Sequence, residues 1–163
     1  MINVYIDSNV FVASELEEEQ NHTESKRFMD YVLKAKHLEM TFSTYVFTFL
    51  ELASAMIRRT KNKDRAYSLL YQIRSSWKDA IKPLGPLPTS KHASFTRLVD
   101  TLIETSIAFC TPSGDTIHAQ TVARYDLDYL ITWNKDHFSE MQTQFKNLKI
   151  LNPKEALEAF GKQ

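Results

Sequence analysis

Four acidic residues stand at positions in this sequence where a carboxylate could do chemistry. Asp7 directly follows a short apolar run, Asp115 opens a helical pattern, and Asp136 comes shortly after another apolar run. Glu51 lies in a helical pattern that is apolar around most of its circumference. Gathered carboxylates repel one another unless a cation neutralises them, and hard oxygen ligands without cysteine or paired histidines favour Mg²⁺ or Mn²⁺ over zinc. The acidic set therefore predicts a divalent metal site, and a carboxylate-bound Mg²⁺ that keeps several waters suits phosphate chemistry.

Short apolar runs that alternate with helical patterns must position these acids. Ser43 is expected to cap the helix that carries Glu51. The alternation is typical of a central parallel sheet between two layers of helices, a three-layer α/β/α sandwich, and the absence of a long linker predicts one domain over residues 1–163. Strands are expected over residues 2–6, 38–42, 80–84, 128–132 and 147–151, and helices over 24–36, 44–59, 61–78, 91–109, 115–124 and 138–145.

Polar side chains recur where the expected strands end. Asp7 ends the first strand, and Thr132, Asn134 and Asp136 come at or after the end of the fourth. The helix opened by Asp115 should begin at the same edge of the sheet. Open parallel sheets bind ligands beyond the carboxyl ends of their strands, so this edge is the expected position of the site.

Three of these acids also have an interpretation that involves no chemistry. Asp115 could simply favour the first turn of a helix because of the helix dipole. Glu51 could lie on a narrow solvent-exposed stripe with Thr48 and Ser54, and Asp7 could belong to a polar turn. The combination of acids at one sheet edge is what favours the metal site.

Composition excludes several classes of protein. The chain has 163 residues, balanced charges (20 Lys+Arg and 20 Asp+Glu) and 43% hydrophobic residues, which excludes a wholly disordered chain. One cysteine, Cys110, excludes a disulfide framework and a thiolate metal cluster, and fits a reducing compartment. No apolar run approaches the roughly 18 residues that span a bilayer, and no signal-peptide pattern opens the chain. We therefore expect a cytoplasmic protein that does not associate with membranes.

Short motifs along nearly the whole chain resemble those of PIN-domain ribonucleases. The opening segment INVYIDSNV (2–10) resembles the first motif of that family, and Glu51 within TFLELA (48–53) resembles its mid-chain helical glutamate. The segments SGDTIHA (113–119) and YLITWNKDHF (129–138) resemble its two later acidic motifs, and residues 148–153 resemble its last strand. The resemblance implies a parallel sheet between helices and an acidic pocket that holds Mg²⁺ or Mn²⁺. Many bacterial and archaeal members, of the virulence-associated protein C type, are toxins of toxin–antitoxin pairs that cut RNA.

The resemblance also implies roles for particular residues. Hydrolysis of an RNA phosphodiester bond would depend on acidic metal ligands. Many members carry a fourth acid at the position of Asn134, so either Asn134 or the nearby Asp136 would complete the site here. His118 is expected to be a structural residue facing the sheet rather than a general base, because a metal-bound water needs no histidine. The implied catalytic and metal-binding residues are Asp7, Glu51, Asp115 and Asp136, with Asn134 as a further ligand, and the residues that would hold carboxylates or metal-bound waters are Ser8, Asn9 and Thr132.

A basic cluster follows the Glu51 helix. It can contact RNA phosphates, or it can be a solvated helix end where cations are favoured in any case. Family members of the toxin type usually form homodimers and bind an antitoxin that inserts into the acidic pocket, so both partners are expected here. The cluster consists of Arg58, Arg59, Lys61, Lys63 and Arg65, opposed only by Asp64.

The alternative function is that of a PIN-fold interaction protein without catalytic activity. Asn134, in place of an acid, is the best argument for it. Asp7, Glu51 and Asp115 argue against it, because buried acids without a metal would only destabilise the fold.

Overall fold

One parallel sheet organises the molecule. The computed structural model describes residues 1–35, 39–85 and 95–161, and the strands of this part follow the order β3-β2-β1-β4-β5. Every neighbouring pair of strands is parallel, and the central strand β1 pairs with β2 on one side and with β4 on the other. The strands are β1 (Ile2–Ile6), β2 (Met40–Tyr45), β3 (Ile81–Leu84), β4 (Tyr129–Ile131) and β5 (Lys149–Leu151).

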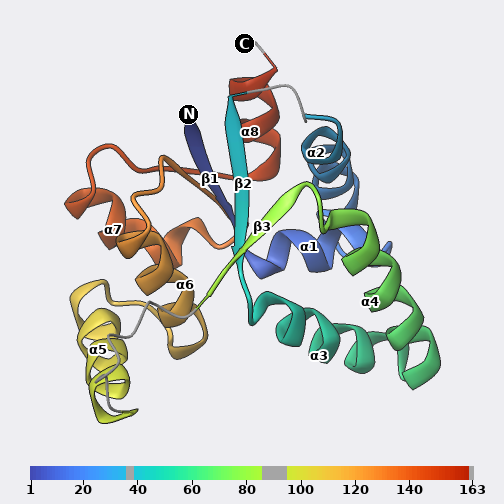
Figure 1. Ribbon diagram of the computed structural model, residues 1–163, viewed down its shortest axis with the longest axis horizontal. Coiled ribbons are helices and arrows are strands. Elements are labelled where there is room, and N and C mark those ends of the chain that lie inside the picture. Colours follow the sequence, from blue (N-terminus) through green and yellow to red (C-terminus); the bar gives the residue numbers. More distant parts are fainter. Residues whose placement is uncertain (36–38, 86–94, 162–163) are drawn as a thin grey trace.

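Helices cover both faces of this sheet (Figure 1). Helices α1 to α4 and α8 lie on one side, while α6 and α7 lie on the other with α5 packed against α6. This arrangement confirms the three-layer α/β/α sandwich expected from the sequence. The helices are α1 (Ser8–Glu15), α2 (His22–Lys34), α3 (Thr48–Thr60), α4 (Lys63–Trp77), α5 (Phe95–Ala108), α6 (Ser113–Arg124), the 3₁₀ turn η1 (Lys135–Phe138), α7 (Ser139–Gln144) and α8 (Pro153–Phe160).

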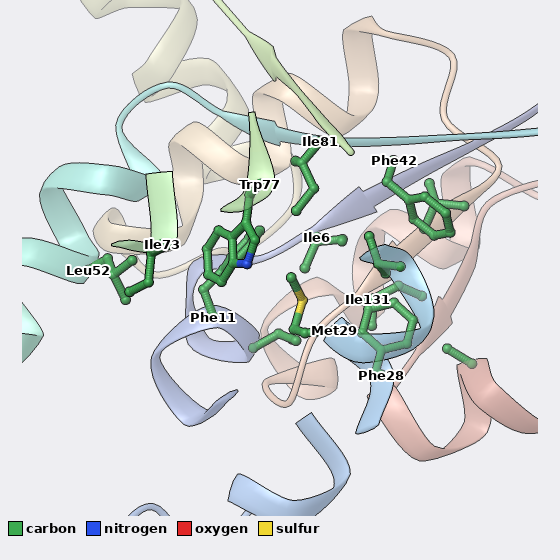
Figure 2. Close-up of a cluster of buried hydrophobic side chains, with 14 of the residues drawn as sticks. Ile6, Phe11, Phe28, Met29, Phe42, Leu52, Ile73, Trp77, Ile81 and Ile131 are labelled. Atoms are coloured by element: carbon green, nitrogen blue, oxygen red, sulfur yellow. The ribbon is translucent and has the colours of Figure 1, made fainter. Parts of the chain in front are cut away.

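The central strand is buried on both faces, which explains its apolar sequence. Val4 and Ile6 belong to the hydrophobic cluster beneath α1 to α4, where Phe11 packs against Trp77 (Figure 2). Tyr5, between them, points to the opposite face and joins a second cluster beneath α6 and α7. Successive side chains of a strand point to opposite faces, so this single strand contributes to both cores and fixes the position of whatever follows it.

The expected cap at Ser43 is wrong. Ser43 lies within β2, and its hydroxyl donates to the backbone oxygen of Val4 at 3.1 Å. The Thr44 hydroxyl likewise donates to the backbone oxygen of Ile6 at 2.8 Å, so both side chains join β2 to β1 instead of ending a helix. Helix α3 begins at Thr48, four residues later than expected. The strand expected over 38–42 is found at Met40–Tyr45, and residue 38 lies outside the described residues, as do residues 91–94 of the helix expected over 91–109.

Two short helices were not expected from the sequence. Helix α1 starts directly after Asp7, and α8 starts at Pro153, where only the end of a strand was expected. A capping box stabilises α8, because the Asn152 side chain accepts from the Glu155 N–H while the Glu155 carboxylate accepts from the Asn152 N–H. In the part of the chain that the structure describes, no helix is long and apolar enough to cross a membrane.

Candidate active site

Asp7 lies where the sheet order reverses. It follows β1 directly, and its N–H donates to the backbone oxygen of Ile131, at the end of the neighbouring strand β4. From β1 the chain continues to β2 on one side and returns to β4 on the other, so the carboxyl ends of β1 and β4 flank a topological switch point. Ligands of open α/β sheets bind at such points. The buried Asp7 side chain is therefore in the position that favours a site.

Polar side chains hold the Asp7 carboxylate in one orientation. Asp7 is the N-cap residue of α1, but its side chain does not cap the helix. One carboxylate oxygen, Oδ2, accepts from the Thr132 hydroxyl at 2.6 Å and from the Asn9 amide at 2.8 Å. From the residues that the structure describes, the other oxygen, Oδ1, accepts a single longer hydrogen bond, 3.2 Å from the Ser8 hydroxyl. This asymmetry leaves Oδ1 as the oxygen with lone pairs to spare.

Thr132 and Asn9 are themselves fixed by further hydrogen bonds. The Asn9 carbonyl oxygen accepts from the Trp133 N–H at 3.2 Å, and its amide also donates to the Thr132 hydroxyl at 3.0 Å. The Asn134 N–H donates to the same hydroxyl at 3.0 Å. The end of β4 and the start of α1 are thus joined through Asp7 by a network of short polar contacts.

Glu51 reaches this site from the first turn of α3. Its side chain is 41% exposed, so it is less buried than its apolar neighbours suggested. Of the alternative exposed stripe with Thr48 and Ser54, Thr48 is buried, while Ser54 is exposed and lines the same groove as Glu51. Burial acts to raise the pKa of Glu51, but the hydrogen bond and charge of His118, together with the Ser8 hydroxyl, outweigh it and lower that pKa below its usual range. The residue is therefore held as a carboxylate.

His118 lies at the centre of the acidic group. It is buried on α6, its Nε2 lies 3.0 Å from Glu51 Oε2 and 3.7 Å from Asp7 Oδ1, and its Nδ1 lies 2.5 Å from the Tyr5 hydroxyl. Asp115 precedes it by three residues on α6, which places the two on the same helix face. Burial acts to lower the pKa of His118, but Glu51, Asp7 and Asp115 outweigh it and raise that pKa. His118 thus contacts two of the acids, Glu51 and Asp7, and interacts with the charge of the third, Asp115.

Asp115 has a histidine partner of its own. Its Oδ2 lies 2.6 Å from Nδ1 of His137, which is more exposed than the carboxylate. Burial raises the pKa of Asp115, the His137 hydrogen bond opposes this, and the negative charge of Asp7 adds to the increase. Asp7 therefore lies close enough to Asp115 for their two negative charges to interact.

Sequence reasoning placed His118 against the sheet, and its contact with Tyr5 of β1 agrees with that expectation. It missed the contacts of His118 with Glu51 and Asp7, and it gave no role to the Asp115–His137 pair. The spacing of three residues between Asp115 and His118, which places both on one face of a helix, was the signal that His118 lies close to the acids.

Asp136 and Asn134 lie at the margin of the site. Both are exposed, in or beside η1. Within the described residues, Asp136 makes no hydrogen bond or ion pair with Asp7, Glu51 or Asp115. Its neighbour His137 makes the contact to Asp115 instead. The involvement of Asp136 and Asn134 stays a prediction.

A groove of about 760 Å³ runs between α1 and α3. Ser8, Asn9 and Glu51 line it beside the acidic site, and Arg58 and Arg59 line it further along α3. Arg59 is paired with Glu19 at 2.9 Å, so its charge is partly compensated. The other members of the basic cluster, Lys61, Lys63 and Arg65, are exposed at the turn into α4 and do not line the groove.

The donors at this site match Mg²⁺ or Mn²⁺ in chemistry. In the described part of the chain, no three His, Cys, Asp or Glu side chains are spaced to hold a metal ion directly. Mg²⁺ does not require such a cage, because it keeps several waters and binds through one or two carboxylates. The lightly bonded Asp7 Oδ1 has lone pairs that a divalent ion could accept, and Asp115, whose pKa is raised first by burial and then by the charge of Asp7, is a second carboxylate whose ionised form an ion would favour. The residues present therefore fit this ion.

Comparison with solved structures gives the same fold. The chain superimposes on the toxin VapC20 of Mycobacterium tuberculosis, described as cleaving the sarcin–ricin loop, with a TM-score of 0.59 and 16% identity over 85% of this chain and 94% of that one. The chain has the VapC fold. It also superimposes on VapBC2 of Rickettsia felis, solved with a DNA fragment from its promoter, with a TM-score of 0.57 and 13% identity over 93% of this chain and 98% of that one. No protein-family model and no curated protein matches the sequence, so the likeness to VapC proteins is one of fold.

Proposed function

We propose that this protein is a Mg²⁺- or Mn²⁺-dependent endoribonuclease of the VapC toxin type, hydrolysing RNA phosphodiester bonds. The observation that carries the proposal is the convergence of Asp7, Glu51 and Asp115 around His118 at the carboxyl edge of the sheet. These acids come from three separate elements. If each had only a structural role in its own element, nothing would require the three to lie close together. The VapC fold supports the proposal, since the structures that share it include a toxin described as cleaving the sarcin–ricin loop.

The bound ion would activate a water molecule and stabilise charge on the phosphate. This chain would hold it through Asp7, Glu51 and Asp115, with Asp136 or Asn134 as a further ligand. Thr132 and Asn9 keep Asp7 Oδ2 occupied, so that Asp7 would bind the ion through its other oxygen, Oδ1. Ser8 lies between Asp7 and Glu51 and supports both carboxylates.

RNA would enter along the groove between α1 and α3. Arg58 follows Glu51 by two helical turns, roughly 10 Å, which is within the reach of a second or third phosphate of a single strand. Arg59, Lys61, Lys63 and Arg65 extend the positive charge beyond it. Because phosphate contacts release counterions, the affinity should depend steeply on salt.

An antitoxin protein is the partner proposed from the VapC likeness, and a homodimer is proposed on the same ground. The alternative function, that of an interaction protein without activity, draws on one observation: no three ligating side chains of the described residues are spaced for a metal as they stand. Titration with Mn²⁺ separates the two, because the inactive protein would bind little metal at these acids.

Asp7→Asn tests the proposed function. Cleavage of single-stranded RNA with Mg²⁺ should fall by at least about 100-fold, because the ion that would activate the water and stabilise charge on the phosphate loses a charged ligand. Asp79→Asn is the matched control, because Asp79 is exposed and precedes β3 at the opposite edge of the sheet. Wild-type cleavage by folded Asp7→Asn, or cleavage that persists in EDTA, would refute the assignment.

Arg58→Ala tests the path of the RNA. Affinity for single-stranded RNA should fall modestly, and the slope of log affinity against log salt should decrease by about 0.7, because one phosphate fewer is neutralised. Lys146→Ala, an exposed change before β5 at the far edge, should leave the slope unchanged. Equal slopes for both variants would place the RNA elsewhere.

A further inference from the structure

Tyr5 and His118 form a buried pair behind the acidic site. Tyr5 is fully buried in β1, His118 is 2% exposed on α6, and the two side chains meet at 2.5 Å. Their rings also pack edge to face, with centroids 5.9 Å apart. Neither ring has room to rotate, so the imidazole presents its Nε2 edge in one direction.

That edge faces the carboxylates. Nε2 lies 3.0 Å from Glu51 Oε2 and 3.7 Å from Asp7 Oδ1. The neutral imidazole whose Nδ1 accepts a hydrogen bond from the Tyr5 hydroxyl carries its hydrogen on Nε2, and the imidazolium carries one there as well. In either state Nε2–H donates to Glu51, so the contact does not depend on how His118 titrates.

The direction of this hydrogen bond matters because Glu51 is half-exposed and has, besides His118, only the Ser8 hydroxyl as a polar partner among the described residues. Its side chain is 41% exposed and comes from a helix on the opposite side of the sheet from α6. A free glutamate side chain in the first turn of a helix samples several rotamers, and holding it in one costs conformational entropy. The rigid Tyr5–His118 pair removes much of that freedom before any ion binds.

We propose that His118, supported by Tyr5, is a positioning residue that fixes the Glu51 carboxylate for the divalent ion. The inference rests on the proposed function and adds to it a residue outside the expected acidic set. The pair acts through Glu51 and contacts neither the ion nor the RNA. Groups of this kind, which orient a metal-binding side chain, typically change metal affinity by 10–100-fold when they are removed.

Calorimetric titration of the full chain with Mn²⁺ tests the proposal. His118→Leu should weaken Mn²⁺ binding by about 10–100-fold. His118→Gln should recover most of the affinity, because a glutamine amide N–H can stand where Nε2–H stood. Tyr5→Phe, which removes only the hydroxyl behind the imidazole, should give a smaller, several-fold loss.

Thr121→Val is the matched control. Thr121 is buried one turn further along α6, and among the described residues its hydroxyl donates to the backbone oxygen of Ile117 on the same helix. It should bind Mn²⁺ as the wild type does. Urea unfolding without metal, measured on each variant, separates impaired positioning from impaired folding.

Each outcome decides the matter. Equal Mn²⁺ affinity for wild type and His118→Leu would overturn the positioning role while leaving the proposed function intact. Equal losses of Mn²⁺ affinity in His118→Leu and His118→Gln would overturn it too. The amide N–H of glutamine should restore a positioning hydrogen bond, and a lack of recovery would mean that the imidazole has only a structural role. If His118→Leu does not fold, Tyr5→Phe carries the test, and unchanged binding refutes the proposal. A wild-type protein that binds no Mn²⁺ would overturn the proposed function and this inference together.

Discussion

Two histidine–carboxylate pairs lie at the same edge of the sheet, and they are built in opposite ways. In the pair of His118 and Glu51, the imidazole is 3% exposed and the carboxylate 41%. In the pair of His137 and Asp115, the imidazole is 43% exposed and the carboxylate 17%. The pKa of Glu51 is lowered and that of Asp115 is raised, although each accepts a short hydrogen bond from a histidine.

The difference shows that a histidine partner alone does not set the charge state of an acid. Burial is the largest influence on both carboxylates and favours the neutral form of each. Glu51 overcomes it because His118, also acted on by two further acids, stays beside it as a strong donor. Asp115 does not, because the charge of Asp7 adds to the effect of burial. A divalent ion would therefore favour the ionised form of Asp115 more than that of Glu51, which is already ionised.

The largest predicted contrast concerns the two histidines. Without metal, His118→Leu should lower the free energy of unfolding by about 1–3 kcal/mol, because the buried Tyr5 hydroxyl then loses its partner. His137→Ala, at an exposed position, should stay within about 0.5 kcal/mol of the wild type. Urea unfolding at neutral pH measures both, and similar losses for the two would contradict the difference in burial between the two pairs.

The second prediction is that the two acids, Glu51 and Asp115, change the stability of the fold in opposite directions as the pH changes. A lowered pKa means that ionised Glu51 adds stability above its usual pKa of about 4.5, which is lost as the pH falls through the folded value. The raised pKa of Asp115 has the opposite effect. Protonated Asp115 adds stability below pH 3.8, its usual pKa, and this stability is lost as the pH rises through the pKa of the folded state. At pH 7 without metal, Glu51→Gln should therefore destabilise the fold and Asp115→Asn should stabilise it.

Thermal unfolding from pH 3 to pH 7 checks this second prediction. Because glutamine and asparagine resemble the protonated acids, each variant should approach the wild type at the acidic end. Shifts of the same sign at pH 7 would contradict the opposite pKa directions.

The smallest effect is expected within the exposed pair. The hydrogen bond and charge of His137 lower the pKa of Asp115, so His137→Ala should raise that pKa further. The Asp115 carboxyl resonance, followed by NMR across the acidic range, reveals the change. His22→Ala serves as the control, because the His22 ring bonds to the backbone oxygen of Ala13 and not to Asp115. An unchanged Asp115 titration in His137→Ala would show that the pair does not persist in solution.

Several parts of the fold and site follow from local sequence. The apolar run that becomes β1 predicts a buried strand, and Asp7 and Thr132 stand at strand ends where an open sheet binds ligands. Helix α1 was not predicted because its first residues, Ser8 and Asn9, are typical of turns. Its N-cap residue has the right type, but the Asp7 carboxylate is engaged by Thr132 across 125 residues of sequence and does not cap. No local pattern contains that contact.

The sequence by itself determined which acids stand at element ends and that strands alternate with helices, because burial and backbone geometry impose short periodicities on the chain. Only the tertiary structure decided that α6 brings His118 between Tyr5 and Glu51, and that Ser43 and Thr44 join two strands instead of capping a helix. Contacts between elements far apart in sequence depend on how whole elements pack. A hydroxyl or an imidazole satisfies its hydrogen bonds with whichever partner that packing supplies.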